Sequence, residues 1–198
     1  MKSIGSQRLA NQQQILVSLG SNLPSPAGTP RETLQQAVKT LGKIGLAGLE
    51  VSGLYETVPI PASDQPNFLN CALKAHTAIP AEKILSLFKV TEKALGRQLG
   101  DRWSARTLDI DLVAYGDNVL PSRTTWDQLT CNENPSAYID EVTVPHPRLH
   151  KRAFVLLPLM DIAPDWVHPC LSQSVREMVE NADVNLQGKD VVKISDCL

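Results

Sequence analysis

Two aspartates, Asp109 and Asp111, alternate with apolar residues in the segment LDIDL at 108–112. Because successive side chains of a β-strand point to opposite faces, we expect both carboxylates on one face and the apolar side chains on the other. Neighbouring carboxylates repel each other unless a cation lies between them, and Mg²⁺ prefers oxygen ligands of this kind. The spacing therefore predicts a site for two Mg²⁺ ions, with the solvent-facing edge of an amphipathic strand as the alternative.

Basic residues lie on both sides of this acidic pair in the sequence. They are Arg97, Arg102 and Arg106 before the pair and, near His146, Arg148, Lys151 and Arg152 after it. A planar guanidinium group matches the oxygens of a phosphate bidentately. Carboxylates that hold Mg²⁺ beside arginines are what phosphoryl transfer requires, whereas the alternative is an ordinary solvated basic surface.

Three further side chains are suited to a flat ligand. Trp103 lies between the arginines of a polar loop, where an indole either covers such a ligand or anchors the loop in the core. Phe68 and Asn70 are two residues apart on an expected strand, so an aromatic ring and an amide share one face. Together they predict a slot for a planar heterocycle, and the alternative is a packed ring beside a turn-capping amide.

Other common site patterns are weak or absent. His146 and His150 are four residues apart, but Pro147 intervenes and no third nitrogen or sulfur ligand is near, so we do not expect zinc. The sequence contains no GxxxxGK[ST], GxGxxG or GxSxG motif. P-loop, dinucleotide and serine-hydrolase sites are therefore disfavoured.

Four strand-like and two helix-like segments must position these residues. The strands are expected at residues 15–19, 49–57, 68–74 and 107–115. One helix begins at Pro30 after a capping box at Thr29 and ends near Gly42, and a second runs from Pro80 to about Gly96. The order β-α-β-β-α-β predicts an α+β, ferredoxin-like fold in which helices pack on one face of an antiparallel sheet.

The rest of the chain differs from this core in composition. Residues 1–14 are expected to form a flexible polar tail, and residues 117–141, polar and aperiodic, a surface insertion. Residues 169–198 are expected to be a peripheral C-terminal extension with a short helix at 175–180. The main domain then spans residues 15–168. Two short elements are expected between the insertion and the extension, an edge strand at 142–145 and a helix at 149–160.

The composition narrows the class of protein. The chain has 198 residues and a net charge of −2, which argues against a broad electrostatic grip on nucleic acid. The longest uninterrupted apolar run, at 153–160, is too short to cross a bilayer, so we expect no membrane association. The four cysteines form no CxxC pair and no signal peptide is evident, so we expect reduced thiols and a cytoplasmic location.

Four motifs together resemble those of a known family. They are LGSNL (19–23), DQPNFLN (64–70), RWSARTLDIDL (102–112) and VPHPRLHKRAF (144–154). On these motifs, residues 15–168 closely resemble the 6-hydroxymethyl-7,8-dihydropterin pyrophosphokinases of folate biosynthesis. The resemblance implies a ferredoxin-like fold and transfer of the β,γ-pyrophosphoryl group of ATP, with two Mg²⁺ ions, to the hydroxymethyl oxygen of the pterin, with release of AMP. It further implies a monomer whose partners are these two substrates.

The resemblance also implies roles for individual residues. Asp109 and Asp111 match the carboxylates that hold both Mg²⁺ ions, and Arg97, Arg106 and Trp103 match residues of a mobile catalytic loop. Residues matching the ATP side are Glu92, Arg97, Arg106, His146 and Arg152. Residues matching the pterin pocket, where two aromatic rings sandwich the bicycle, are Thr57, Pro59, Phe68, Asn70, Trp103 and Phe154.

Some positions depart from the family pattern. Phe68 stands where many members have tyrosine, which removes a hydroxyl but keeps a ring for stacking. Lys89 stands where glutamine is common near the nucleotide, and Ser104 and Ala105 replace the usual Gly-Pro. We therefore expect the catalytic loop to move differently while the chemistry stays the same. The segment 117–141 is longer than usual and has no role assigned.

Two other functions compete with this one. Metal-dependent glycosyl- and nucleotidyltransferases also use a D-x-D pair, but usually in a larger α/β domain than this chain can form. An RNA-binding sheet on the same fold would need exposed aromatic residues and a basic sheet face. Asp109 and Asp111 would repel phosphate on such a face in the absence of metal.

Overall fold

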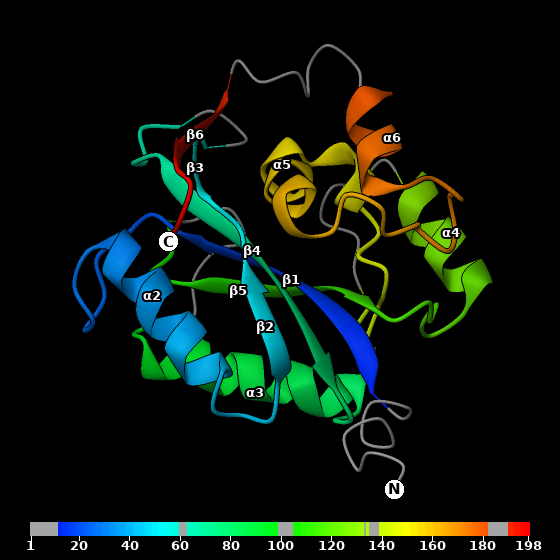
Figure 1. Cartoon of the computed structure of the whole chain (residues 1–198), viewed down its shortest axis with the longest axis horizontal. Helices are drawn as coiled ribbons and strands as arrows, with labels where there is room; N and C mark the ends of the chain where they lie inside the picture. The colour runs from blue at the N-terminus through cyan, green and yellow to red at the C-terminus, as the bar shows by residue number, and fades with distance from the viewer. Residues whose placement is uncertain (1–11, 60–62, 99–104, 133, 135–138, 182–189) are drawn as a thin grey trace, which may run out of the picture.

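The computed structural model describes residues 12–59, 63–98, 105–132, 134, 139–181 and 190–198. Within them, antiparallel strands form one sheet in the order β5-β1-β4-β3-β6, and β2 also pairs with β4 (Figure 1). The strands are β1 Gln13–Ser21, β2 Ala47–Val51, β3 Leu54–Thr57, β4 Phe68–Thr77, β5 Asp109–Tyr115 and β6 Val191–Ser195. β2 and β3 are two halves of the expected second strand, so the predicted ferredoxin-like order is confirmed.

Local sequence explains where the helices begin. The helices are α2 Pro30–Leu41, α3 Ala81–Ala94, α4 Arg123–Cys131, α5 Ala153–Ile162 and α6 Val175–Glu180. At α2 the predicted capping box is present, because the Thr29 hydroxyl accepts the Glu32 N–H and the Glu32 carboxylate accepts the Thr29 N–H. α6 has the same box, formed by Ser174 and Glu177. None of the helices in these described ranges is long and apolar enough to span a bilayer.

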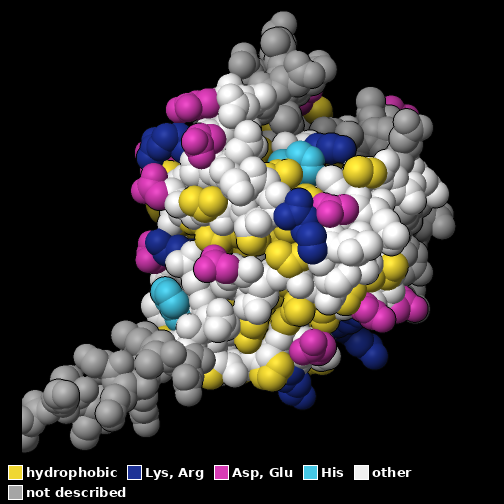
Figure 2. All heavy atoms as spheres, turned by 90° about the vertical axis from the view of Figure 1, so that its right-hand side faces the viewer, with side chains coloured by type: hydrophobic (Ala, Val, Ile, Leu, Met, Phe, Trp, Pro, Cys, Tyr) yellow, Lys and Arg dark blue, Asp and Glu magenta, His cyan; other side chains and the backbone are white. Residues whose placement is uncertain are grey.

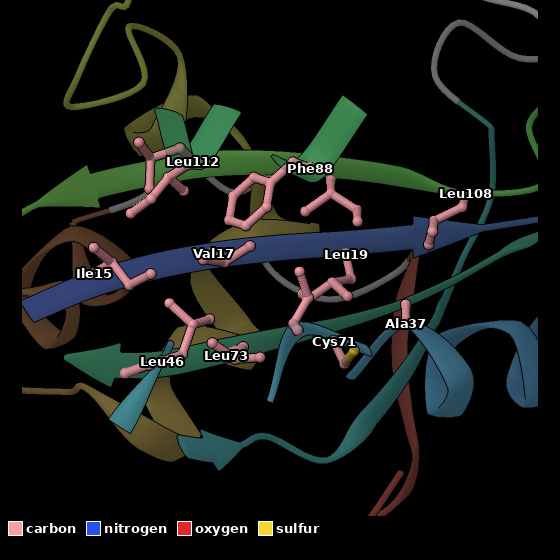
Figure 3. Packing of buried hydrophobic residues seen from close by; sticks show 14 of the residues in the cluster. Ile15, Val17, Leu19, Ala37, Leu46, Cys71, Leu73, Phe88, Leu108 and Leu112 are labelled. Atoms are coloured by element: carbon pink, nitrogen blue, oxygen red, sulfur yellow. The ribbon is translucent and has the colours of Figure 1, made fainter. Parts of the chain in front are cut away.

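An apolar core lies against each face of the sheet. Ile15, Val17 and Leu19 of β1 point towards α2 and α3 and form one apolar core with residues of β4 and β5 (Figure 3). Leu16 points the other way, into a second core that includes Leu156 of α5. The two helices of the predicted core, α2 and α3, therefore lie on one face as expected, and α5 covers the opposite face (Figure 1). A helix that is almost wholly apolar requires burial, and this face of the sheet supplies it.

The segment 142–160 is less regular than predicted. The expected edge strand at 142–145 is absent from the described residues there, where Val144 forms only an isolated bridge with Leu120. The expected helix at 149–160 is divided into a 3₁₀ turn, Leu149–Lys151, and α5. Arg152 separates the two because its backbone is extended, with φ −125° and ψ 97°.

The two segments that were expected to lie outside the core are partly built into it. Residues 117–141 contain α4, which is exposed or half-buried except that its Trp126 is buried. The C-terminal extension forms the expected helix α6 but also adds β6 to the sheet edge beside β3. β1 begins at Gln13, so the described end of the expected tail is already strand. Residues 1–11 lie outside the described ranges.

Candidate active site

Asp109 and Asp111 lie on β5, and the predicted alternation is observed. Their side chains are 30% and 42% exposed, whereas Leu108, Ile110 and Leu112 are buried in the core beneath α2 and α3. Both carboxylates therefore project from the sheet face that α5 partly covers. In the part of the chain that the structure describes, no three His, Cys, Asp or Glu side chains gather into a metal site. This aspartate pair would need further oxygen ligands, such as phosphate or water, to complete the coordination of Mg²⁺.

Two of the predicted arginines contact Asp109. Its Oδ1 accepts hydrogen bonds from Nη1 of Arg97 at 2.7 Å and from Nη1 of Arg106 at 2.8 Å. Arg97 also donates to Glu92 of α3. Glu92 is nearly buried and accepts the Ile110 N–H at 2.8 Å, so it holds Arg97 from behind the strand. The structure thus brings these predicted residues together, with Glu92 one layer deeper than the arginines.

The electrostatics of this cluster favour added positive charge. Burial raises the pKa of Glu92 to about 7, although Arg97 and the Ile110 N–H oppose the shift. Burial and the neighbouring Asp111 also raise the pKa of Asp109, against the opposing effect of the two arginines. The carboxyl groups of Glu92 and Asp109 are therefore costly to ionise, and a nearby positive charge lowers that cost.

His146 and Arg152 lie beside Asp111. Arg152 Nη1 is 3.8 Å from Asp111 Oδ2 and 3.4 Å from His146 Nε2. Burial, together with Arg152 and Arg148, lowers the pKa of His146 to about 3, so the imidazole is neutral at pH 7. Its Nδ1 accepts the Arg148 N–H at 3.1 Å, which leaves the ring proton on Nε2. Two donors side by side are suited to sharing one anionic oxygen, such as that of a phosphate.

Two of the expected pterin residues are hydrogen-bonded to each other on neighbouring strands. Asn70 Nδ2 of β4 donates to Thr57 Oγ1 of β3 at 2.9 Å, and both side chains are buried. Gly20 of β1 is the register partner of Asn70, and a Cβ at Gly20 would lie 2.9 Å from Asn70 Oδ1. The absence of a side chain there leaves room for the amide. Phe68 is half-buried at the start of β4.

The other predicted residues differ in their burial and in their position in the fold. Phe154 is half-buried in the first turn of α5, with the Arg152 guanidinium 5.6 Å from its ring centroid. Pro59 is buried just beyond β3, and Lys89 is exposed on α3. The predictions for Trp103, Arg102 and Ser104 lie outside the described residues.

Sequence reasoning missed a role for Asn22. This buried residue accepts the Arg106 N–H on Oδ1 at 2.7 Å, and its own N–H donates to the Arg106 carbonyl at 3.0 Å. Its Nδ2 also donates to the Pro66 carbonyl at 3.1 Å, so it links the arginine to the loop before Phe68. The signal was the motif LGSNL at 19–23, in which we assigned Asn22 no role of its own.

The surface charge is mixed. Figure 2 shows one face on which basic and acidic side chains are interspersed among apolar and neutral ones. The described atoms of this face carry no continuous basic patch. This face therefore lacks the electrostatic footprint of a nucleic-acid-binding surface.

Comparison with known proteins identifies relatives in sequence. A family model described as 7,8-dihydro-6-hydroxymethylpterin-pyrophosphokinase (HPPK) matches residues 16–164. The chain is 32% identical over 165 residues to the 2-amino-4-hydroxy-6-hydroxymethyldihydropteridine pyrophosphokinase of Haemophilus influenzae, covering 83% of this chain and 89% of that protein. It is 31% identical over 153 residues to a mitochondrial folate synthesis bifunctional protein of Arabidopsis thaliana, covering 77% of this chain and 24% of that protein.

Solved structures show the same fold. The crystal structure of wild-type Plasmodium falciparum HPPK-DHPS superposes with a TM-score of 0.57 and 16% sequence identity, covering 92% of this chain and 48% of that one. At this identity, the likeness concerns the fold alone. The chain thus spans about a quarter of the Arabidopsis protein and about half of the Plasmodium chain.

Proposed function

The chain belongs to the 7,8-dihydro-6-hydroxymethylpterin-pyrophosphokinase family, and from this membership we propose that it transfers the β,γ-pyrophosphoryl group of ATP to the hydroxymethyl oxygen of 6-hydroxymethyl-7,8-dihydropterin. The products are AMP and the pterin diphosphate, which belongs to folate biosynthesis. The observation that carries the proposal is the meeting of Asp109 and Asp111 with Arg97, Arg106 and Arg152 on one sheet face. This is a site for an oligophosphate rather than for a neutral ligand.

Asp109 and Asp111 fit the binding of Mg²⁺. They are partly exposed carboxylates on the same face of one strand, and burial and the neighbouring Asp111 raise the pKa of Asp109 despite its two arginine partners. We propose that they hold two Mg²⁺ ions together with phosphate oxygens. When bound, these ions would neutralise the charge on the phosphates and orient them.

The basic residues would hold the triphosphate. Contacts with Asp109 hold the guanidinium groups of Arg97 and Arg106 beside the aspartate pair, where they would meet the phosphates. His146, with its ring proton on Nε2, and Arg152 would donate to one oxygen on the nucleotide side. Glu92 would act by positioning Arg97, since its carboxylate is turned towards the core.

The pterin would bind beside Asn70. The amide of Asn70 and the hydroxyl of Thr57 would recognise the polar edge of the bicycle, and Phe68 and Phe154 would stack on its two faces. The pterin hydroxyl oxygen would then attack the β-phosphorus in line while AMP departs on the opposite side. Positioning of the two substrates, rather than a dedicated base, would supply most of the rate enhancement. Trp103 belongs to this proposal through family resemblance alone.

A product assay with ATP, Mg²⁺ and 6-hydroxymethyl-7,8-dihydropterin tests this function. We expect pterin-dependent formation of AMP and pterin diphosphate, with loss of product on metal chelation. Asp111→Ala should abolish transfer and leave the fold intact, because this partly exposed side chain packs against little. ADP as the product would refute pyrophosphoryl transfer, and near-normal turnover of Asp111→Ala would refute the metal assignment.

We also propose that the chain acts as a monomer in the cytoplasm. Size-exclusion chromatography with light scattering tests the first point, and fractionation of cells that express the chain tests the second. A stable dimer, or recovery with an organelle such as the mitochondrion named for the Arabidopsis relative, would overturn the respective proposal.

A further inference from the structure

The segment around α4 contacts the loop that carries His146. Leu120 and Val144 exchange two backbone hydrogen bonds, with N···O distances of 2.8 and 3.3 Å. Farther along, Arg148 Nη2 donates to the Asn134 carbonyl at 3.0 Å. Contacts therefore tie the inserted segment to the loop on both sides of His146.

Two further contacts with this loop come from one face of α4. Trp126 and Thr130 are four residues apart and so lie on the same side of the helix. The Trp126 indole N–H donates to the Pro145 carbonyl at 2.8 Å, and the Thr130 hydroxyl donates to the Pro147 carbonyl at 3.4 Å. These two carbonyls flank His146. Trp126 is only 2% exposed, so its contact is shielded from competing water.

Two prolines limit the backbone hydrogen bonds that the His146 loop can make. Pro145 and Pro147 have no N–H to donate, so regular strand pairing is unavailable at these positions. Their carbonyls still need donors when they are shielded from water, and α4 provides them. From the other side, the His146 N–H donates to the Val113 carbonyl of β5 at 2.8 Å, two residues beyond Asp111. His146 is thus held between β5 on one side and α4 on the other.

We propose that α4 is a positioning element of the nucleotide site, with Trp126 and Thr130 setting where His146 lies relative to Arg152 and Asp111. This inference rests on the proposed function. The proposal assigns the segment 117–141 a role in the affinity for ATP. The sequence alone left this segment without a role. Trp126 and Thr130 are positioning residues, since neither reaches the substrates itself.

Two conservative variants test the proposal in the full chain. Trp126→Phe keeps an aromatic ring but removes the N–H, and Thr130→Val keeps the shape but removes the hydroxyl. The dissociation constant of a non-hydrolysable ATP analogue with Mg²⁺, measured by calorimetry, should rise about 3- to 10-fold for Trp126→Phe, the effect of losing one hydrogen bond. The longer contact of Thr130 predicts a smaller rise, about 2- to 3-fold. The pterin dissociation constant should stay unchanged.

Gln128→Ala is the matched control, because Gln128 is exposed on the same helix and should leave both affinities unchanged. Thermal melting establishes that each variant is folded at the assay temperature. Unchanged affinity for the ATP analogue in both folded variants would overturn the proposal. Equal loss of ATP and pterin affinity would overturn it as well, since it would indicate general loosening of the fold.

A second measurement separates this proposal from the proposed function. If the wild-type chain bound no ATP analogue, the proposed function would fail, and the positioning role would then be judged by the ¹⁵N NMR signals of the His146 ring. Displacement of the Nδ1 and Nε2 signals in Trp126→Phe, but not in Gln128→Ala, would support that role. Signals unchanged from the wild type would refute it.

Discussion

Adding a single methyl group at Gly20 should weaken pterin binding without unfolding the chain. The Cβ of Gly20→Ala would lie 2.9 Å from Asn70 Oδ1, whereas ordinary contacts begin at 3.4 Å. The amide must therefore retreat by several tenths of an ångström. Its position is fixed by the 2.9 Å hydrogen bond from Asn70 Nδ2 to Thr57 Oγ1, which this movement would lengthen or break. The fold should survive because the clash involves the end of a side chain.

The size of the effect follows from one perturbed hydrogen bond. Such a bond contributes about 0.5–1.5 kcal/mol, so we expect the KM for the pterin to rise about 3- to 10-fold with the KM for ATP unchanged. Steady-state kinetics with each substrate varied in turn provide the measurement. Gly42→Ala is the matched control, because Gly42 has an ordinary helical φ of −62° and its Cβ would meet nothing closer than 3.5 Å.

A double-mutant cycle shows whether the effect passes through the amide. If Gly20 acts only by leaving room for Asn70, Gly20→Ala should add nothing to the loss already caused by Asn70→Ala. Additive losses, or a normal pterin KM for Gly20→Ala alone, would refute the reasoning.

Two further predictions concern the phosphate side. Asn22→Ala should lower kcat about tenfold while the chain stays folded, because Arg106 loses the acceptor that fixes its backbone, and an unchanged single-turnover rate would contradict this. His146 has a pKa of about 3 in the folded chain against an ordinary value of 6.5, so the unfolded chain binds the extra proton and stability should fall as pH drops below about 6.5. Between pH 7.5 and pH 5.5, the free energy of unfolding should fall by about 1 kcal/mol less in His146→Asn than in the wild type. Denaturant unfolding at the two pH values measures this difference. Equal pH dependence in the two proteins would show that His146 does not contribute.

Much of the core could be predicted from the sequence because it depends on local patterns. The capping box at Thr29 fixes the start of α2 by contacts within four residues. The alternation in LDIDL fixes which face of β5 carries the two aspartates, since a strand has a period of two. The motifs around these residues also indicated the family, because the relevant residue types stand close together in the chain.

Positions that depend on distant partners could not be predicted in this way. Trp126 is buried, and its indole N–H donates to the Pro145 carbonyl, nineteen residues farther along the chain. This contact anchors a segment whose polar sequence predicts an exposed position. β6 forms only because β3 offers an unpaired edge more than a hundred residues earlier. Asn22 reaches Arg106 across 84 residues.

The sequence by itself thus determined which residue types could perform the chemistry and the order of the elements that carry them. Only the tertiary structure decided that α5 forms a third layer, that Glu92 supports Arg97 from the core side, and that α4 contacts the His146 loop. The physical reason is that periodicity and capping act within a few residues. Burial and hydrogen-bond satisfaction depend instead on whichever groups the folded chain brings together.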